Sequence, residues 1–180
     1  MNGPTFRPGV ALVLAGLAGL AAAAPLAAQK DVEQTIARFT EADSGSAHWF
    51  AAAAGYAIFP SVGKGGIGIG GARGKGFVYR KGGVLLGKAT LTAVTIGLQL
   101  GGQKFSEVIF FEDQAHLDSF MEGNFEFNAQ VSAVAVTAGA SADAGYEHGV
   151  AVFTMTRGGL MYEASVGGQK FSFEPVDDDD

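Results

Sequence analysis

The sequence predicts a mainly β (α+β) fold, in which a curved antiparallel sheet, barrel- or sandwich-like, follows two short N-terminal helices and contains one inserted helix. Two stretches before residue 55 place apolar residues at helical spacing. From Tyr56 onward, segments rich in Val, Ile, Thr and Phe alternate with glycine-containing turns, which is typical of strands. One helical pattern returns near residue 114 and ends at a glycine.

The first segment has the composition of an export signal. Arg7 supplies one positive charge, and an apolar run of 17 residues covers 10–26 before small and polar residues follow. This order predicts a secretory signal peptide over residues 1–28, cleaved after Ala28. The alternative is a retained anchor, but the run is shorter than the roughly 20 residues that span a bilayer. We expect a protein secreted across the inner membrane and located in the periplasm or at the envelope.

Removal of residues 1–28 from the 180-residue chain leaves 152 residues, which suits one domain with a substantial core. We expect an N-terminal helix and linker over 29–46, the main domain over 47–175 and an acidic tail over 176–180. The chain contains no cysteine, which excludes disulfides, thiol nucleophiles and thiolate metal sites. The sequence predicts no particular oligomeric state.

The helices are predicted from the spacing of apolar residues and from their end signals. The first covers 31–43 and is amphipathic. The second covers 46–54, with Ser46 as its cap and Gly55 as its stop. The third covers about 114–122 and ends at Gly123.

The candidate strands lie between glycine-rich turns. They cover 67–72, 76–80, 84–86, 88–100, 107–111, 130–138, 150–156, 160–166 and 169–173. Hairpin turns are predicted at 81–83 and 157–159, because glycine adopts the positive φ that such turns need. Within 88–100 the alternation of polar residues changes parity near Val94, which predicts a β-bulge or a sharp bend there.

One hexapeptide, GGQKFS, occurs twice, at 101–106 and at 167–172. Little else matches between the two regions, so the chain does not have the pattern of a repeat protein. We interpret the repeated hexapeptide as marking two comparable edges of one sheet.

The glycine-rich run 63–76 contains the string G-x-G-x-x-G twice. A dinucleotide site would need a helix after this string and an acidic residue about 20 positions later. The next segment is strand-like instead, and no acid occurs before Glu107. We therefore expect no nucleotide and no other cofactor.

Within that run, glycines alternate with isoleucines, so that one face of a strand would be bare backbone and open to close approach. The glycines are Gly66, Gly68 and Gly70, and the isoleucines are Ile67 and Ile69.

One cluster combines acids with a histidine: Glu112, Asp113, His116 and Asp118. Glu112 and His116 are four residues apart and could share a cation, but acids also suit a helix N-terminus. We expect no metal site, and no nucleophile motif is present. We therefore expect a protein that is not an enzyme, with a periplasmic hydrolase using His116 or His148 as an alternative.

Charges are sorted along the chain. Seven cations and no acid lie between residues 44 and 106: Lys64, Arg73, Lys75, Arg80, Lys81, Lys88 and Lys104. Eight acids and no Lys or Arg lie between 107 and 147: Glu107, Glu112, Asp113, Asp118, Glu122, Glu126, Asp143 and Glu147. Either the basic block forms a local basic surface or the two blocks neutralise each other across paired strands. The net charge of −6 and the export signal make nucleic acid a poor partner.

Three strings carry a resemblance to a known family. The segments 55–60 (GYAIFP) and 64–76 (KGGIGIGGARGKG) resemble the opening signature of SYLF domains. The segment 97–103 (GLQLGGQ) is similar to the second signature, and 158–162 (GGLMY) to a stretch near the C-terminal end. Together they extend the resemblance over nearly all of residues 47–175.

The resemblance implies a lipid-binding module, associated in eukaryotic members with phosphoinositides and actin regulation. By that analogy Lys64, Arg73 and Lys75 would contact lipid headgroups, and Ile67 and Ile69 would make apolar contact beside them. The chain departs from the family in having Ala54 where Lys is common, and in an acidic rather than a basic leading segment. We expect no actin partner, because an exported protein would not meet cytosolic actin.

The sequence thus predicts an exported protein that associates with anionic phospholipid or a lipid-like ligand through a basic, glycine-rich strand region. A small outer-membrane β-barrel or a structural envelope protein is the alternative, because glycine-rich alternating strands also occur there.

Overall fold

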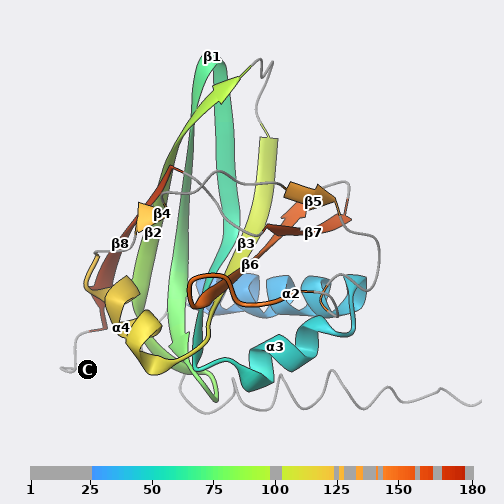
Figure 1. Cartoon of the computed structure of the whole chain (residues 1–180), viewed down its shortest axis with the longest axis vertical. Coiled ribbons are helices and arrows are strands. Elements are labelled where there is room, and N and C mark those ends of the chain that lie inside the picture. The colour runs from blue at the N-terminus through green and yellow to red at the C-terminus, as the bar shows by residue number, and fades with distance from the viewer. Residues whose placement is uncertain are drawn as a thin grey trace, which may run out of the picture.

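The computed structural model describes residues 26–97, 103–123, 126–127, 133–135, 141, 144–156, 159–163 and 168–176. Its helices are α2 (Leu26–Ala42), α3 (Ser46–Ala52) and α4 (Gln114–Met121). Its strands are β1 (Gly55–Arg80), β2 (Val84–Gly97), β3 (Gln103–Phe111), β4 (Glu126–Phe127), β5 (Ala133–Ala135), β6 (Val150–Thr156), β7 (Gly159–Glu163) and β8 (Gln169–Pro175). They form one antiparallel sheet in the order β4-β8-β2-β1-β3-β6-β7-β5 (Figure 1).

Strand β1 is 26 residues long and doubles back on itself, so that it supplies two neighbouring limbs of the sheet (Figure 1). Its first limb pairs with β3 and its second limb with β2. At the open end of this fold-back, the amide of Lys81 donates to the carbonyl of Ala54 at 2.8 Å. Further along, a Cβ placed on Gly74 would lie 3.2 Å from the carbonyl oxygen of Ser61. Glycine is needed at Gly74 and Gly76 because the facing limb leaves no room for a side chain there.

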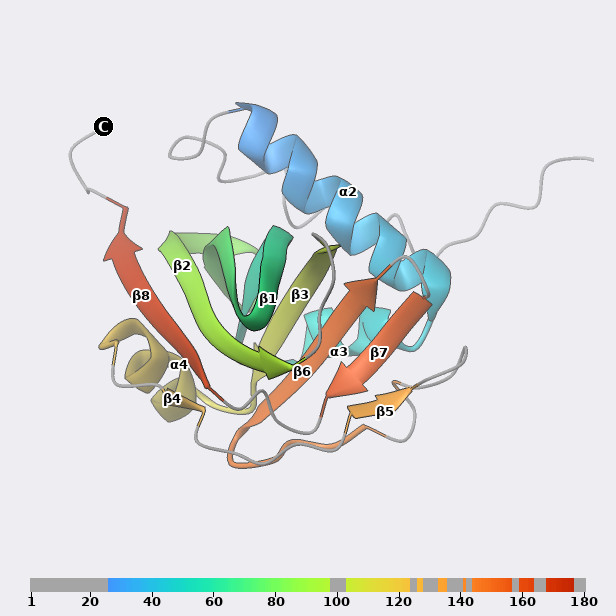
Figure 2. The same cartoon turned by 90° about the horizontal axis from the view of Figure 1, so that it is seen from above.

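The sheet is curved and has a hydrophobic cluster on each face. The inner face carries side chains such as Leu91, Ile109 and Phe171, which pack with Leu117 and Phe120 of α4. Residues of opposite parity form the outer face, whose cluster lies against α2 and α3 and includes Val32, Ile36, Phe39, Trp49, Phe50, Tyr56, Tyr79, Phe110 and Phe153. In Figure 2, α2 and α4 lie on opposite sides of the sheet.

A buried hydrogen bond crosses the inner face. The side-chain amide of Gln169 in β8 donates to a carboxylate oxygen of Glu107 in β3 at 3.2 Å. These strands are not neighbours in the sheet, so the contact requires the sheet to curl around the inner cluster. The prediction of a curved, mainly antiparallel sheet with two N-terminal helices and one inserted helix is confirmed.

Two local expectations need correction. Of the β-bulge or sharp bend expected near Val94, the bulge is wrong, because β1 and β2 stay in continuous register from Gly68↔Gly97 to Val78↔Gly87. The register shifts instead between Val78 and Tyr79, and a second shift lies in the β1–β3 pairing between Phe59 and Val62. The first helix begins at Leu26, upstream of the expected cleavage point.

The turn expected at 81–83 is confirmed, with φ of 85° at Gly82 and 82° at Gly83. The other expected hairpin joins β6 and β7, which pair from Thr156↔Gly159, while 157–158 lie outside the described residues. The C-terminal residues 177–180 also lie outside them. Among the helices that the structure describes, none has the length and apolar character needed to cross a bilayer.

Candidate functional site

The predicted basic site lies at the end of the sheet where β1 folds back, called here the upper end because it is uppermost in Figure 1. Arg73 and Lys75 lie on the second limb of β1 and are exposed on the outer face. They share this face with Phe77 and Tyr79, because alternate residues of a strand point to the same side. The structure therefore brings these two predicted cations together on one surface.

Lys64 lies on the first limb at the same end of the sheet. It follows Gly63, which is exposed opposite Lys104, and is therefore at the alternate position of the strand. Lys64 is half-buried, whereas Arg73 and Lys75 are exposed. Lys64 has the parity of Val62, which belongs to the inner cluster, so it lies on the inner face, opposite to the face that carries Arg73 and Lys75.

The register bears on whether acidic residues neutralise these cations. Arg73 lies opposite Thr92 and Lys75 opposite Thr90 in β2, while Lys64 lies opposite Gln103 in β3. None of these register partners is acidic. By contrast Lys88, lower on β2, lies opposite Glu174 of β8. The upper end thus keeps a local basic surface on an acidic protein.

The structure describes most of the acidic residues between 107 and 147, and those named here lie away from the upper end of the sheet. Glu107 is fully buried on the inner face, where Gln169 donates to it. Glu112, Asp113, Asp118 and Glu122 lie on or beside α4. Glu126 lies opposite Lys170 at the β4 edge of the sheet.

The predicted apolar contacts Ile67 and Ile69 lie within the fold-back of β1, together with Gly66, Gly68 and Gly70. The backbone of Ile69 pairs with Ile96 of β2, and the side chains of 66–69 lie outside the described part of the chain. The close backbone approaches that the structure does describe are lower on β1, at Gly74 and Gly76.

An apolar side chain that sequence reasoning missed stands beside the cations. Val94 of β2 is 68% exposed and lies opposite Gly71, one outer-face position above the pair Arg73–Thr92. The change of parity near Val94 was the available signal. It marks an apolar residue on the exposed face rather than an interruption of the strand.

The lower end of the same outer face is covered. Trp49 and Phe50 of α3 pack on Phe110 with ring centroids 5.7 and 4.9 Å away. Tyr56 and Tyr79 stack at 5.2 Å with an interplanar angle of 23°. Burial, followed by the nearby charge of Glu33, raises the pKa of Tyr79 to about 12. Burial, followed by the charge of Tyr79, also raises the pKa of Tyr56.

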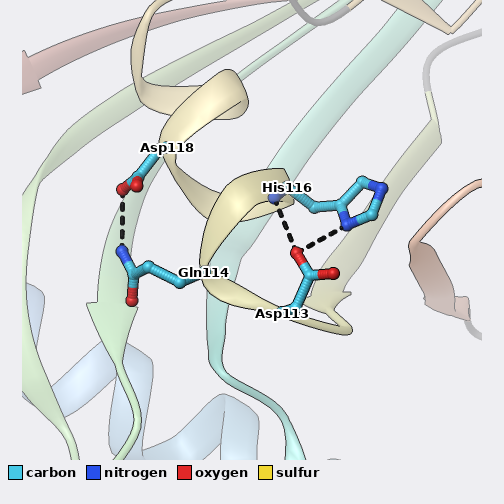
Figure 3. A network of polar contacts seen from close by, with 4 residues as sticks. All are labelled: Asp113, Gln114, His116 and Asp118. Atoms are coloured by element: carbon cyan, nitrogen blue, oxygen red, sulfur yellow. Dashed lines mark hydrogen bonds and ion pairs between the residues drawn. The ribbon is translucent and has the colours of Figure 1, made fainter.

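The acid-and-histidine cluster forms the start of α4 (Figure 3). Asp113 accepts from the His116 amide at 3.0 Å and lies 2.8 Å from Nδ1 of its ring, while Gln114 donates to Asp118 at 2.7 Å. The hydrogen bond from the His116 amide is the main cause of the lowered pKa of Asp113. Asp113 therefore acts as a helix N-cap. Within the described ranges, no group of three or more His, Asp or Glu side chains is placed to hold a metal ion.

The family comparison matches the C-terminal half of the chain. Residues 92–178 match the family described as Ysc84, Las17-binding protein actin regulator. A 72-residue segment is 33% identical to Beta cell expansion factor A of Aeromonas veronii and covers 40% of this chain. That segment is 28% of the length of the relative, so the chain spans well under half of that protein.

Proposed function

The chain belongs to the SYLF family, and we propose that it is an exported binding protein, not an enzyme, that docks on anionic phospholipid through the upper end of its outer face. Family membership supports a lipid-binding or actin-related domain. Our proposal adds the export of the protein, the negative charge of the lipid headgroups and the residues that contact them. In it, Arg73 and Lys75 contact headgroups, Lys64 adds charge from the inner face at the same end of the sheet, and Ile67 and Ile69 make the apolar contact.

The observation that carries the proposal is the contrast in register partners. Arg73 and Lys75 are exposed opposite threonines, whereas Lys88 on the same sheet lies opposite Glu174. Cations without an acidic partner across the strand keep their attraction for an anionic surface, at about 1 kcal/mol each before salt screening. The exposed Val94 adds apolar contact next to them.

The test is sedimentation of the purified protein with neutral phosphatidylcholine vesicles and with vesicles containing phosphatidylserine, at low and high salt. We expect pelleting with the anionic vesicles alone, weakened by salt. The double substitution Arg73→Gln and Lys75→Gln should weaken binding about 25-fold, since each cation contributes about fivefold. Lys64→Gln should have a smaller effect, because Lys64 is half-buried and lies on the inner face.

The matched control is Arg80→Gln with Lys88→Gln, which removes the same charge from the lower end of the sheet. This control should bind as wild type. Equal losses in the two doubles would mean that net charge alone governs binding, and a wild-type protein that pellets with neither vesicle would overturn the proposal.

Actin binding is the second candidate, because the matching family is described as an actin regulator. An exported protein would not meet cytosolic actin, so we expect no cosedimentation with filamentous actin. Saturable cosedimentation would favour the actin-related function. Export itself is tested by sequencing the N-terminus of the protein recovered from the periplasm, which we expect to begin at Gln29.

A further inference from the structure

Three polar side chains from separate strands converge on the inner face of the sheet, and we call them the inner polar cluster. Glu107 lies in β3, Thr154 lies opposite it in β6, and Gln169 of β8 donates to the Glu107 carboxylate at 3.2 Å. All three are buried, with exposed fractions of 0%, 4% and 6% for Glu107, Thr154 and Gln169. The curl of the sheet, visible in Figure 2, directs the side chains of this concave face toward one another.

Two oxygen atoms of the inner polar cluster need hydrogen-bond donors. Among the side chains that the structure describes, the Thr154 hydroxyl and the amide oxygen Oε1 of Gln169 are buried without a hydrogen-bond partner. The Gln169 amide cannot turn round to correct this, because its nitrogen donates to Glu107 and a flipped amide would set two acceptors against each other. A buried polar atom without a partner costs free energy. These two oxygens therefore indicate a bound group that donates hydrogen bonds to them.

The carboxylate of the cluster selects the kind of donor. A carboxylate has about four acceptor positions, so Glu107 can contact a ligand in addition to its protein partners. Aromatic rings border it, because Phe59 lies directly opposite Glu107 in β1 and packs at 5.8 Å against Phe171 of β8. In apolar surroundings a carboxylate is stabilised by a positive charge in contact with it. A donor that also carries positive charge therefore fits the cluster better than a water molecule.

We propose that the inner polar cluster binds an ammonium group, either the free ion or the primary ammonium of a small ligand. A primary ammonium has three N–H donors and no acceptor, which match the three oxygen-bearing side chains. Divalent metal ions take six or more ligands, and the described ranges place no group of three His, Asp or Glu side chains to hold one. The inference concerns the inner face and is independent of the docking of the outer face on vesicles.

The experiment measures the melting temperature of the purified protein in ammonium, methylammonium, potassium and tetramethylammonium chlorides at equal ionic strength. We expect a saturable rise with ammonium, since a ligand that binds the native state stabilises it. Potassium has nearly the size of ammonium, but neither potassium nor tetramethylammonium carries an N–H donor, so neither should produce the rise. A rise with methylammonium as well would assign the site to a primary amine, and a rise with ammonium alone to the free ion.

The variants remove one feature of the cluster at a time. Thr154→Val removes the unpartnered hydroxyl, so without ammonium it should be at least as stable as wild type. It should bind ammonium about tenfold more weakly, the loss expected for one hydrogen bond to a charged group. Glu107→Gln removes the charge and should abolish the rise, with near-UV circular dichroism establishing that it is folded. The matched control Thr90→Val removes a half-buried hydroxyl from β2, opposite Lys75, and should respond as wild type.

NMR with isotope-labelled ammonium reads the site directly, and we expect the protons of bound ammonium to contact the methyl group of Thr154. A wild-type melting temperature that responds to neither amine would overturn the proposal and assign the cluster to water. An equal rise with potassium would assign it to a metal cation and overturn the proposal too, as would equal responses of wild type and Thr154→Val. Vesicle pelleting should be the same for Thr154→Val and wild type, so this inference and the proposed function fail separately.

Discussion

The two ends of the outer face are built by the same strands and differ in what covers them. At the lower end, Tyr79 and Phe110 are buried beneath α2 and α3. At the upper end, Arg73 and Val94 are open to solvent. From Tyr79 to Arg73 the alternation of β1 continues along one limb, so the difference does not arise from a change in strand geometry. It arises because α2 and α3 cover the lower end and leave the upper end exposed to solvent.

This difference separates stability from binding within one surface. The lower end contributes apolar burial and aromatic contacts, which are lost on unfolding. The upper end contributes little burial and retains charge that an external partner can use. Substitutions at the two ends should therefore affect different measurements.

The largest effect is expected at the centre of the lower end. Phe110 is 1% exposed and contacts the rings of Trp49, Phe50 and Phe153. Phe110→Ala should lower the free energy of unfolding by about 3–5 kcal/mol, measured by urea denaturation. The upper-end counterpart Val94→Ala should change it by no more than about 0.5 kcal/mol. A similar loss in both would remove the distinction between the two ends.

The next effect concerns the fold-back of β1 that creates the upper end. A Cβ at Gly76 would meet the carbonyl of Ile58 and the ring of Phe59. Gly76→Ala should therefore cost about 1–3 kcal/mol in unfolding free energy. Gly65→Ala is the matched control, because nothing lies within 4 Å of a Cβ there. Equal stability of the two variants would show that the limbs are not closely packed.

A further effect is the dependence of stability on alkaline pH. An exposed tyrosine in the unfolded chain ionises near pH 10, whereas the pKa of Tyr79 is raised to about 12 and that of Tyr56 is raised as well. The unfolded state therefore loses protons first, so stability present below pH 10 should fall as the pH rises from about 10 to 12. The double variant Tyr56→Phe, Tyr79→Phe should show a shallower fall in urea midpoint. An unchanged slope would contradict this assignment.

The covered end was easier to predict than the open end. The helices over 31–43 and 46–54 carry Ile36, Phe39 and Trp49 at a spacing that requires a buried face, and the structure buries it. The doubling-back of β1 was missed because glycines mark turns and close approaches alike. The structure separates the two by the contacts of Gly74 and the open space around Gly65.

At the open end, the resemblance to the SYLF family indicated Lys64, Arg73 and Lys75 but could not give their register. The order of strands, in which β8 follows β2 and β3 follows the first limb of β1, results from long-range pairing. That pairing decides that Arg73 and Lys75 share the outer face while Lys64 lies on the inner face. Local sequence carries no record of it. The interpretation of the repeated hexapeptide as two edges of the sheet is wrong, because β3 lies between β1 and β6 and β8 lies between β4 and β2.

The most direct test of the open end uses the absence of cysteine from the chain. Val94→Cys and, separately, Lys88→Cys are labelled with the environment-sensitive fluorophore NBD and mixed with phosphatidylserine vesicles. The account predicts a blue shift and increased emission for the label at Val94, with little change at Lys88, which lies lower on the same strand opposite Glu174. Vesicle binding with no change at Val94, or with the larger change at Lys88, would contradict the claim that the upper end of the outer face meets the membrane.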